Sequence, residues 1–356
     1  MGHRVVLFRA ALGILAASAA SGLRAQDARS EVRIKLSARD GSPVSGALVA
    51  LLNTRDSVVA EGLASENGTR VLVAPRGAYR VRVRRIGYLP FISSELTIPR
   101  GDEVVLNIES PRVTLQSIVV NSNSPCGRND PNSQALSTVW DEIDKALRSS
   151  QLTLQDLLGI GRARKYSRDI DSSGVVVGGD STEFSITDRR PFGVEDPAKL
   201  AKEGYVTGDM DQGWTIFGPD ETVLLSEGFA STHCFRLVRD SERPTQIGVS
   251  FQPVPRREVP DISGVIWVDQ VTSELREINF HFVNAAELSR FNAGGYTRFV
   301  RMPSGAWIVA EWKLTAPKLM LRPAGPYQSS RLVVIGRRDT GGGILRPPQG
   351  TTRYRP

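Results

Sequence analysis

The sequence has few of the side chains that carry proton transfer or bind metals. Its 356 residues include only three histidines and two cysteines. His3 lies at the very start, which leaves His233 and His281 for any site farther along the chain. A metallopeptidase or a Ser-His-Asp hydrolase needs a histidine beside a second catalytic group, and the motifs H-x-x-E, H-E-x-x-H and G-x-S-x-G do not occur. We therefore expect no catalytic residue, no metal site and no cofactor, and we expect both histidines to be ordinary strand residues.

Long apolar runs are equally scarce. The one at the N-terminus, Val5–Ala20, begins between Arg4 and Arg9 and is followed by small residues and then by Leu23-Arg24-Ala25. A basic start, a short apolar core and a small residue near the exit predict a secretory signal peptide over residues 1–25. An uncleaved N-terminal anchor is the alternative. No later segment is long enough to cross a bilayer, so we expect a mature chain that is periplasmic, associated with the outer membrane, or secreted.

Charge of one sign is not in large excess. The formal charge of +7 falls to +4 once Arg4, Arg9 and Arg24 leave with the signal peptide. A charge this small on a chain of this length does not indicate nucleic-acid binding. We expect instead a protein, polysaccharide or lipid partner in the cell envelope, with membrane contact but no membrane span.

The two cysteines, Cys126 and Cys234, are expected to form a disulfide, because exported proteins fold in an oxidising compartment. The closed loop would be long, and the chain-entropy model assigns such a bridge about 4–5 kcal/mol. Two buried free thiols are the alternative. Together with His233 they are too few to hold a metal ion.

Alternation of apolar and polar residues begins at Val32. Ile34 and Leu36 continue the apolar face, with charged or polar residues between them. Turn-forming pairs follow at Asp40-Gly41 and Asn67-Gly68. Short alternating segments separated by such turns predict an all-β sandwich over residues 30–112. We expect a chain that is mainly β in both of the two domains that its length suggests.

Two motifs in this region resemble the carboxypeptidase regulatory-like domain. Residues 39–47 read R-D-G-S-P-V-S-G-A, similar to the opening of that family, and residues 77–90 contain G-A-Y-R-V-R-V followed by R-I-G-Y-L-P, similar to its close. The resemblance implies a transthyretin-like, seven-stranded sandwich, also grouped with carbohydrate-binding-like folds, and it implies no peptidase activity. Tyr88 is expected to cap the core of the sandwich.

The rest of the chain predicts a linker, a second domain and a tail. Residues 113–134 have the composition of a linker. Residues 135–340 predict a β-rich α+β domain, a curved antiparallel sheet with one or two helices. Thr138 and Asp141 suggest a capping box that opens the first helix. The tail, 341–356, is expected to be disordered and to include the glycines at 341–343.

Two short segments and one basic row carry the expectations about binding. Val113–Val120 is similar to the segment that precedes the plug of TonB-dependent receptors, although a last strand with a linker is the simpler interpretation. The hairpin at 263–278 looks like one in outer-membrane lipoprotein carrier-like sheets, which shelter an apolar ligand. Arg80, Arg82 and Arg84 alternate on one strand and could hold an anionic partner, or simply form a solvated face that protects a sheet edge.

We expect a non-catalytic exported envelope protein whose sandwich docks and whose curved sheet binds a partner or an apolar ligand. One alternative is a hydrolase of envelope glycan or peptide that uses a carboxylate pair. The other is an accessory to TonB-dependent transport. The candidate carboxylates are Asp169, Asp171, Glu183, Asp209 and Asp211.

Overall fold

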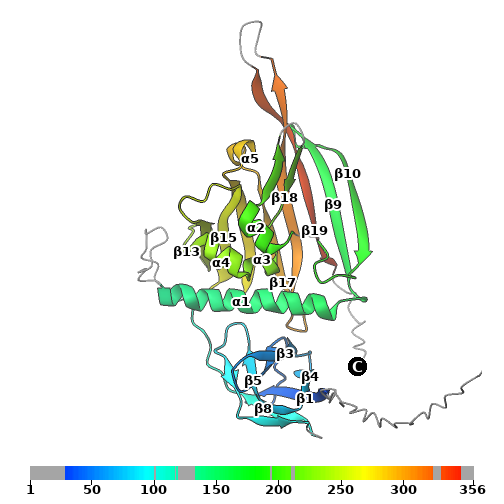
Figure 1. Cartoon of the computed structure of the whole chain (residues 1–356), viewed down its shortest axis with the longest axis vertical. Helices are drawn as coiled ribbons and strands as arrows, with labels where there is room; N and C mark the ends of the chain where they lie inside the picture. The colour runs from blue at the N-terminus through cyan, green and yellow to red at the C-terminus, as the bar shows by residue number, and fades with distance from the viewer. Residues whose placement is uncertain are drawn as a thin grey trace, which may run out of the picture.

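The computed structural model describes residues 29–99, 102–116, 118, 133–192, 195–209, 213–323 and 330–345. The expected signal peptide, Cys126 and Asp211 lie outside these ranges. None of the helices within them is long and apolar enough to cross a membrane. The described chain is mainly β, as predicted, with a sandwich-like N-terminal part and a large antiparallel sheet (Figure 1).

The N-terminal part consists of two small sheets packed face to face. One has the order β4-β1-β8, and the other has the order β3-β2-β5-β6 with β7 also pairing β5. Val32, Ile34 and Leu36 of β1 point inward, as their alternation predicts, and pack against Val49 and Val81 of the other sheet. The strands are β1 (Arg29–Ala38), β2 (Leu48–Leu52), β3 (Val58–Leu63), β4 (Thr69–Pro75), β5 (Gly77–Arg84), β6 (Phe91–Ile92), β7 (Leu96–Ile98) and β8 (Val104–Ile108).

The second part is built on a nine-stranded antiparallel sheet with the order β10-β9-β19-β18-β17-β16-β15-β14-β13. Neighbours from β13 to β19 are consecutive in the chain, whereas the β9–β10 hairpin joins beside β19. The strands are β9 (Arg162–Asp171), β10 (Val176–Ser185), β13 (His233–Val238), β14 (Gln246–Pro253), β15 (Asp261–Asp269), β16 (Leu275–Val283), β17 (Gly294–Arg301), β18 (Trp307–Arg322) and β19 (Arg331–Leu345).

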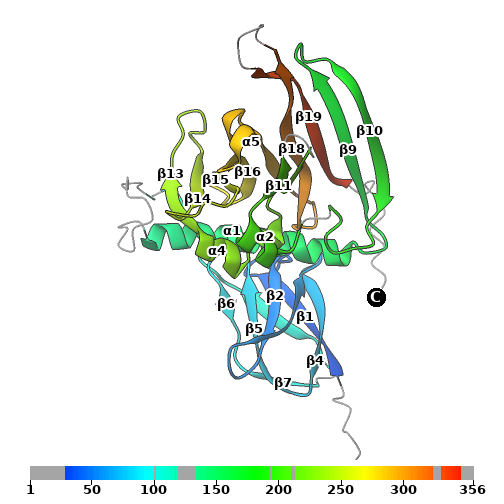
Figure 2. The same ribbon diagram turned by 45° about the horizontal axis from the view of Figure 1, so that its top comes forward.

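Helix α1 (Ser133–Asp156) runs between the sandwich and the large sheet (Figures 1 and 2). Val139, Ile143, Ala146 and Leu147 recur at helical spacing and are fully buried in the core of the sheet. The helix begins before Thr138, so the expected capping box is wrong. The Thr138 hydroxyl instead donates to the carbonyl of Gln134 within the helix.

The chain between β10 and β13 crosses the sheet from one edge to the other, because these two strands are its opposite edges. We call residues 186–232 the crossing segment. It lies over one face of the sheet (Figure 2). Its elements are α2 (Pro197–Glu203), β11 (Val206–Asp209), β12 (Gly213–Ile216), α3 (Glu221–Leu224) and α4 (Glu227–Thr232), and a further short helix, α5 (Ala286–Arg290), connects β16 to β17.

The glycines at 341–343 belong to strand β19 and not to a tail. Gly341 pairs with Lys313 and Tyr166, and Gly342 pairs with Trp312 and Lys165. A Cβ atom at Gly341 would lie 2.5 Å from the hydroxyl oxygen of Tyr166. Glycine is therefore needed here for close packing within a sheet, and this run of glycines was misread as a flexible segment.

Candidate functional site

A cavity of about 230 Å³ lies between the large sheet and the crossing segment. Phe280 and Leu314 of the sheet form one wall, and Ile216 and Phe217 of the crossing segment form another. Gly218 lets the two walls approach, since a Cβ atom there would lie 3.0 Å from the ring of Phe280 and 3.1 Å from the Leu314 side chain. The cavity is therefore a product of the crossing, with mostly apolar walls.

Polar side chains lining the cavity gather where β17, β18, β19 and β9 are adjacent. Lys165, Gly342 and Trp312 lie in one cross-strand row, so they face the same side of the sheet. Thr297 pairs with Trp312 and continues the row. Lys165, Thr297 and Trp312 all line the cavity. The row thus brings an ammonium group and a hydroxyl group to the side of the cavity that the large sheet forms.

Glu221 is a buried carboxyl in the cavity wall. It is the first residue of α3, which Asp220 caps through a hydrogen bond from the Val223 N–H at 2.8 Å. The hydroxyl of Ser150 on α1 donates to Glu221 Oε1. Burial, and secondarily the charge of Asp220, raises the pKa of Glu221 to about 7. A carboxyl in this state can be neutral or charged near neutral pH.

An arginine anchors the loop that closes the cavity on one side. Arg190 Nε donates to Asp220 Oδ2 at 2.8 Å, and Arg190 Nη2 donates to the carbonyl of Glu195 at 3.0 Å. Phe192 of the same loop packs edge-on against Trp312, with ring centres 5.5 Å apart. The loop thus joins α3 to the sheet through one ion pair and one aromatic contact.

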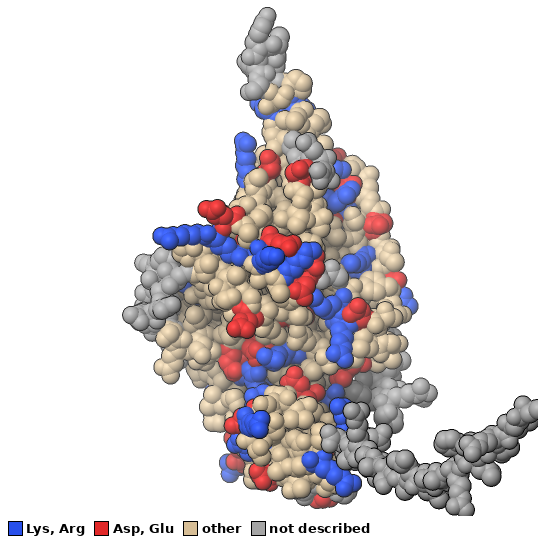
Figure 3. Space-filling view, in the orientation of Figure 1, with Lys and Arg blue, Asp and Glu red and all other residues tan. Residues whose placement is uncertain are grey.

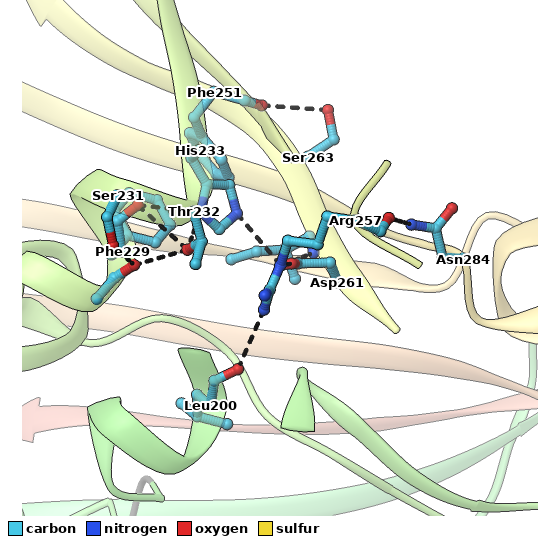
Figure 4. Close-up of polar contacts among 12 residues, drawn as sticks. Leu200, Phe229, Ser231, Thr232, His233, Phe251, Arg257, Asp261, Ser263 and Asn284 are labelled. Atoms are coloured by element: carbon cyan, nitrogen blue, oxygen red, sulfur yellow. Dashed lines mark hydrogen bonds and ion pairs between the residues drawn. The ribbon is translucent and has the colours of Figure 1, made fainter. Parts of the chain in front are cut away.

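A second cluster of ionisable groups lies in the interior, at His233 (Figure 4). His233 Nε2 is 3.2 Å from Asp261 Oδ1, an ion-pair contact without a directed hydrogen bond, and both side chains are fully buried. Arg257 Nε donates to the other oxygen of Asp261. On its far side, His233 Nδ1 lies 3.2 Å from the carbonyl of Phe229.

This cluster holds elements together. Asp261 begins β15, His233 begins β13, and Arg257 Nη2 donates to the carbonyl of Leu200 in α2 at 3.4 Å. None of these three residues lines the cavity described above. A buried histidine thus lies beside an aspartate, but the described contacts of this cluster connect β13, β15 and α2 and indicate a structural role.

Helix α1 is also the docking surface of the sandwich. Lys145 Nζ, fully buried, donates to Glu142 Oε1 at 2.7 Å and to the carbonyl of Tyr88 at 2.9 Å. The Gly87 N–H donates to Glu142 Oε2 at 2.7 Å. Burial raises the pKa of Glu142. Arg84 Nη2 donates to Asp141 Oδ1 at 2.7 Å. Side chains of α1 therefore form direct hydrogen bonds with the R-I-G-Y motif of the sandwich.

Two motif glycines touch turns of the large sheet. Gly46 has a φ of +65°, and a Cβ atom there would lie 2.3 Å from the backbone of Gly305, between β17 and β18. A Cβ atom at Gly87 would lie 3.2 Å from the carbonyl of Thr272, between β15 and β16. A small apolar cluster completes the contact, made of Leu48, Leu63, Leu152 and Ala306.

Residues 31–110 match the model of the carboxypeptidase regulatory-like domain family. The regulatory-like domain thus coincides with the sandwich, and the match suggests a β-sandwich interaction module. No curated protein matches the chain. The chain is also similar to the solved structure of the Bacillus anthracis TIE protein, with 9% identity over 86% of this chain and 48% of that one, about half its length. The TM-score of 0.20 is too low to indicate a shared fold.

The arginine row of the regulatory-like domain is not an open anion-binding surface along its whole length. Arg84 is held between Asp141 and Asp144 of α1, each at 2.7 Å. Arg80 pairs with Asp56. Partial burial, with the charge of Arg84 adding to it, lowers the pKa of Arg82. At least one end of the row therefore serves the contact between domains.

Tyr88 also departs from expectation. Its ring is only partly buried and lies near two guanidinium groups, 4.6 Å from Arg85 and 5.6 Å from Arg112. The core aromatic residue of the regulatory-like domain is Tyr79, whose hydroxyl donates to the carbonyl of Pro75 at 3.0 Å. Tyr88 instead contributes its backbone carbonyl to the contact with Lys145.

The segment that is similar to TonB-dependent receptors packs into the core of the large sheet where it is described. Leu115 is fully buried there, and Val113 and Ile118 pack against the same core. Arg239 Nη2 donates to the carbonyl of Ile118 at 2.7 Å. These residues continue the regulatory-like domain into the second domain, so the described part of the expected linker is a structural connection.

The candidate carboxylates are distributed over ion pairs and turns. Asp169 Oδ1 and Oδ2 accept from Arg338 at 2.8 and 2.9 Å, and the hydrogen bond from Arg338 lowers the pKa of Asp169 to about 2. Asp171 accepts from the backbone of Ser173 in a turn, and Glu183 pairs with Arg162 at 3.3 Å. Asp209 ends β11. None of these four lines the cavity.

The expected disulfide stays a prediction, because Cys126 lies outside the described residues. Cys234 is buried at the start of β13, next to His233. In the pairing of β13 with β14, Cys234 lies opposite Gln252. No group of three metal-ligating side chains gathers within the part of the chain that the structure describes.

Sequence reasoning missed Glu221 and the polar row at Lys165. Asp220-Glu221 has the ordinary pattern of a helix start, and acidic residues are common there. Its buried hydrogen-bond partner, Ser150, is 71 positions away in the sequence. No local pattern could have indicated that this carboxyl lines a cavity.

Proposed function

We propose that this protein is an exported, non-catalytic envelope protein that shelters an apolar ligand in the cavity between its large sheet and the crossing segment. The observation that carries the proposal is the lining of that cavity, which is dominated by Phe192, Phe217, Phe280, Phe299 and Leu314. The regulatory-like domain would serve as a docked interaction module on the opposite side of α1.

The size of the cavity suggests the size of the ligand. An apolar cavity of about 150 Å³ is large enough to bind benzene, and typical sites for drug-sized molecules begin at about 300 Å³. A cavity of about 230 Å³ suits a ring or a segment of an acyl chain. Lys165 and Thr297 would meet a polar end group, because they are the polar side chains in the row beside Trp312.

Binding can be tested with a neutral apolar fluorophore, N-phenyl-1-naphthylamine, and with fatty acids that compete for it. Leu314→Trp places an indole in the cavity, so the affinity for the fluorophore should fall at least tenfold. Leu89→Trp is the matched control, since Leu89 is half exposed on the regulatory-like domain. Equal affinity in the two variants, with unchanged thermal unfolding, would remove the proposal.

A hydrolase is the second candidate, and Glu221 is the observation that favours it. A carboxyl with a pKa of about 7 is suited to general acid or base catalysis at neutral pH. Glu221→Gln should abolish turnover of an ester or glycoside if this candidate is correct. Complete lack of hydrolysis by the natural chain across a panel of both substrate types would exclude it.

A further inference from the structure

Strands β18 and β19 continue past the body of the large sheet as a two-stranded ribbon (Figures 1 and 2). Beyond Gly336, which still pairs with Asp171 of β9, β18 and β19 pair with each other and with no further strand that the structure describes. Three successive cross-strand pairs there are entirely apolar, and the next pair joins two arginines. The pairs are Leu319 with Val334, Met320 with Val333, Leu321 with Leu332, and Arg322 with Arg331.

The ribbon has no core to cover its apolar side chains. Met320 is 44% exposed, Leu321 53% and Val334 45%. Because cross-strand partners point to the same side and successive pairs alternate, Leu321 and Val334 lie on one face and Met320 lies on the other. Apolar side chains are therefore presented on both faces, which is unusual for a water-exposed hairpin.

A second apolar group lies at the same end of the sheet. Val175, Val176 and Val177, at the β9–β10 turn, are each more than half exposed. Val176 pairs with Ile170, which in turn pairs with Arg337 of β19. The valines are therefore two strands away from the base of the ribbon, and the two groups together form one apolar end.

The charges on the ribbon beyond Gly336 are basic, whereas the carboxylate of Asp171 lies in the β9–β10 turn. Arg322 and Arg331 face each other across the ribbon, and like charges in such a pair repel. Neither forms an ion pair with a carboxylate among the described residues. On the face shown in Figure 3, the ribbon is mostly uncharged with basic atoms near its end, and acidic atoms begin lower on the sheet. An anion between the two guanidinium groups would relieve their repulsion.

We propose that this end of the molecule binds the surface of a membrane that contains anionic lipids. The apolar pairs would enter the boundary between headgroups and acyl chains, and Arg322 and Arg331 would contact lipid phosphates. A lipid surface fits better than a second copy of the chain or a groove in another protein, because lipids can surround both apolar faces of the ribbon. The outer edges of the ribbon carry unpaired backbone groups, so the ribbon lies in the interface and does not cross it.

Vesicle flotation of the full chain tests this proposal. We expect binding to vesicles of phosphatidylglycerol and phosphatidylethanolamine, and at least tenfold weaker binding to vesicles of phosphatidylcholine alone. The triple variant Met320→Ser, Leu321→Ser, Val334→Ser should lose binding to both. The matched control is Val59→Ser, Leu89→Ser, Ile92→Ser, which removes three exposed apolar side chains from the regulatory-like domain and should bind as the natural chain does.

A second vesicle experiment tests the role of Arg322 and Arg331. Arg322→Ser with Arg331→Ser should abolish the preference for anionic vesicles while the two vesicle types remain weakly bound. The proposal is overturned if the natural chain binds neither type of vesicle, or if the triple variant of the ribbon binds vesicles as its control does. It is also overturned if the triple variant loses self-association in sedimentation experiments while its vesicle binding stays unchanged. The ribbon variants should retain affinity for N-phenyl-1-naphthylamine, so failure here is distinguishable from failure of the cavity proposal.

Discussion

The carboxyl of Glu221 makes folding stability depend on pH near neutrality. Its pKa in the folded protein is about 7, against an ordinary value of 4.5, because burial disfavours the charged form. The folded state thus holds this proton more tightly than the unfolded state. Its contribution to stability is full below about pH 4.5 and is lost as the pH rises through about 7, by about 3 kcal/mol in total.

Glu221→Gln should remove that loss. We expect the free energy of unfolding in urea, compared between pH 5 and pH 8, to fall by about 3 kcal/mol less in this variant than in the natural chain. Glu227→Gln is a matched control, because Glu227 also begins a short helix but is exposed. It should behave as the natural chain does. A loss of stability of the same size in all three proteins would show that Glu221 does not titrate in this range.

Individual elements were predicted well wherever a local pattern determined them. The hairpin at 263–278 has the expected turn, in which Asp269 Oδ1 accepts from the N–H groups of Val271 and Thr272 at 3.0 and 2.9 Å. In α1, Ile143 and Leu147 recur at helical spacing and lie on its buried face. By contrast, the sequence around Gly341 shows no alternation of apolar residues. The need for glycine there comes from close packing against Tyr166, which lies on a strand distant in the sequence.

The contacts among His233, Asp261 and Arg257 likewise could not be predicted from local sequence patterns. We expect them to contribute to the stability of the fold. Asp261→Ala leaves a buried guanidinium group without its partner, which costs about 3–5 kcal/mol. Asp171→Ala, in an exposed turn, should cost much less, because water can replace the lost hydrogen bonds. The measurement is chemical denaturation of both variants. Comparable losses would mean that the cluster adds little to the attachment of β13 and β15.

Three layers make up the molecule: the regulatory-like domain, α1 and the large sheet with its crossing segment. The ribbon and the regulatory-like domain lie at opposite ends of the longest axis (Figure 1). With the ribbon on a lipid surface, the regulatory-like domain would point away from it, toward a partner. The β-sandwich could be predicted from two sequence motifs, but its position could not, because the contacts with α1 join residues more than fifty positions apart.

Fixed docking of the regulatory-like domain can be tested at a single glycine. Gly41 and Gly46 both have positive φ angles, +80° and +65°, so alanine at either position adopts a strained backbone, at a cost of about 1–2 kcal/mol. A Cβ atom at Gly41 meets nothing within 4 Å, whereas one at Gly46 meets the backbone of Gly305. Gly46→Ala should therefore cost about 1–3 kcal/mol more than Gly41→Ala.

Hydrogen exchange distinguishes a loosened contact from local strain. In Gly46→Ala, amide exchange should increase both in the turn at Gly305 and at Gly87, whose N–H is held by Glu142 across the domain contact. In Gly41→Ala, exchange at both places should match the natural chain. Alanine is strained at both positions, but only Gly46 lies against the backbone of Gly305. Identical exchange rates in the two variants would therefore mean that the domains are not held together at this point.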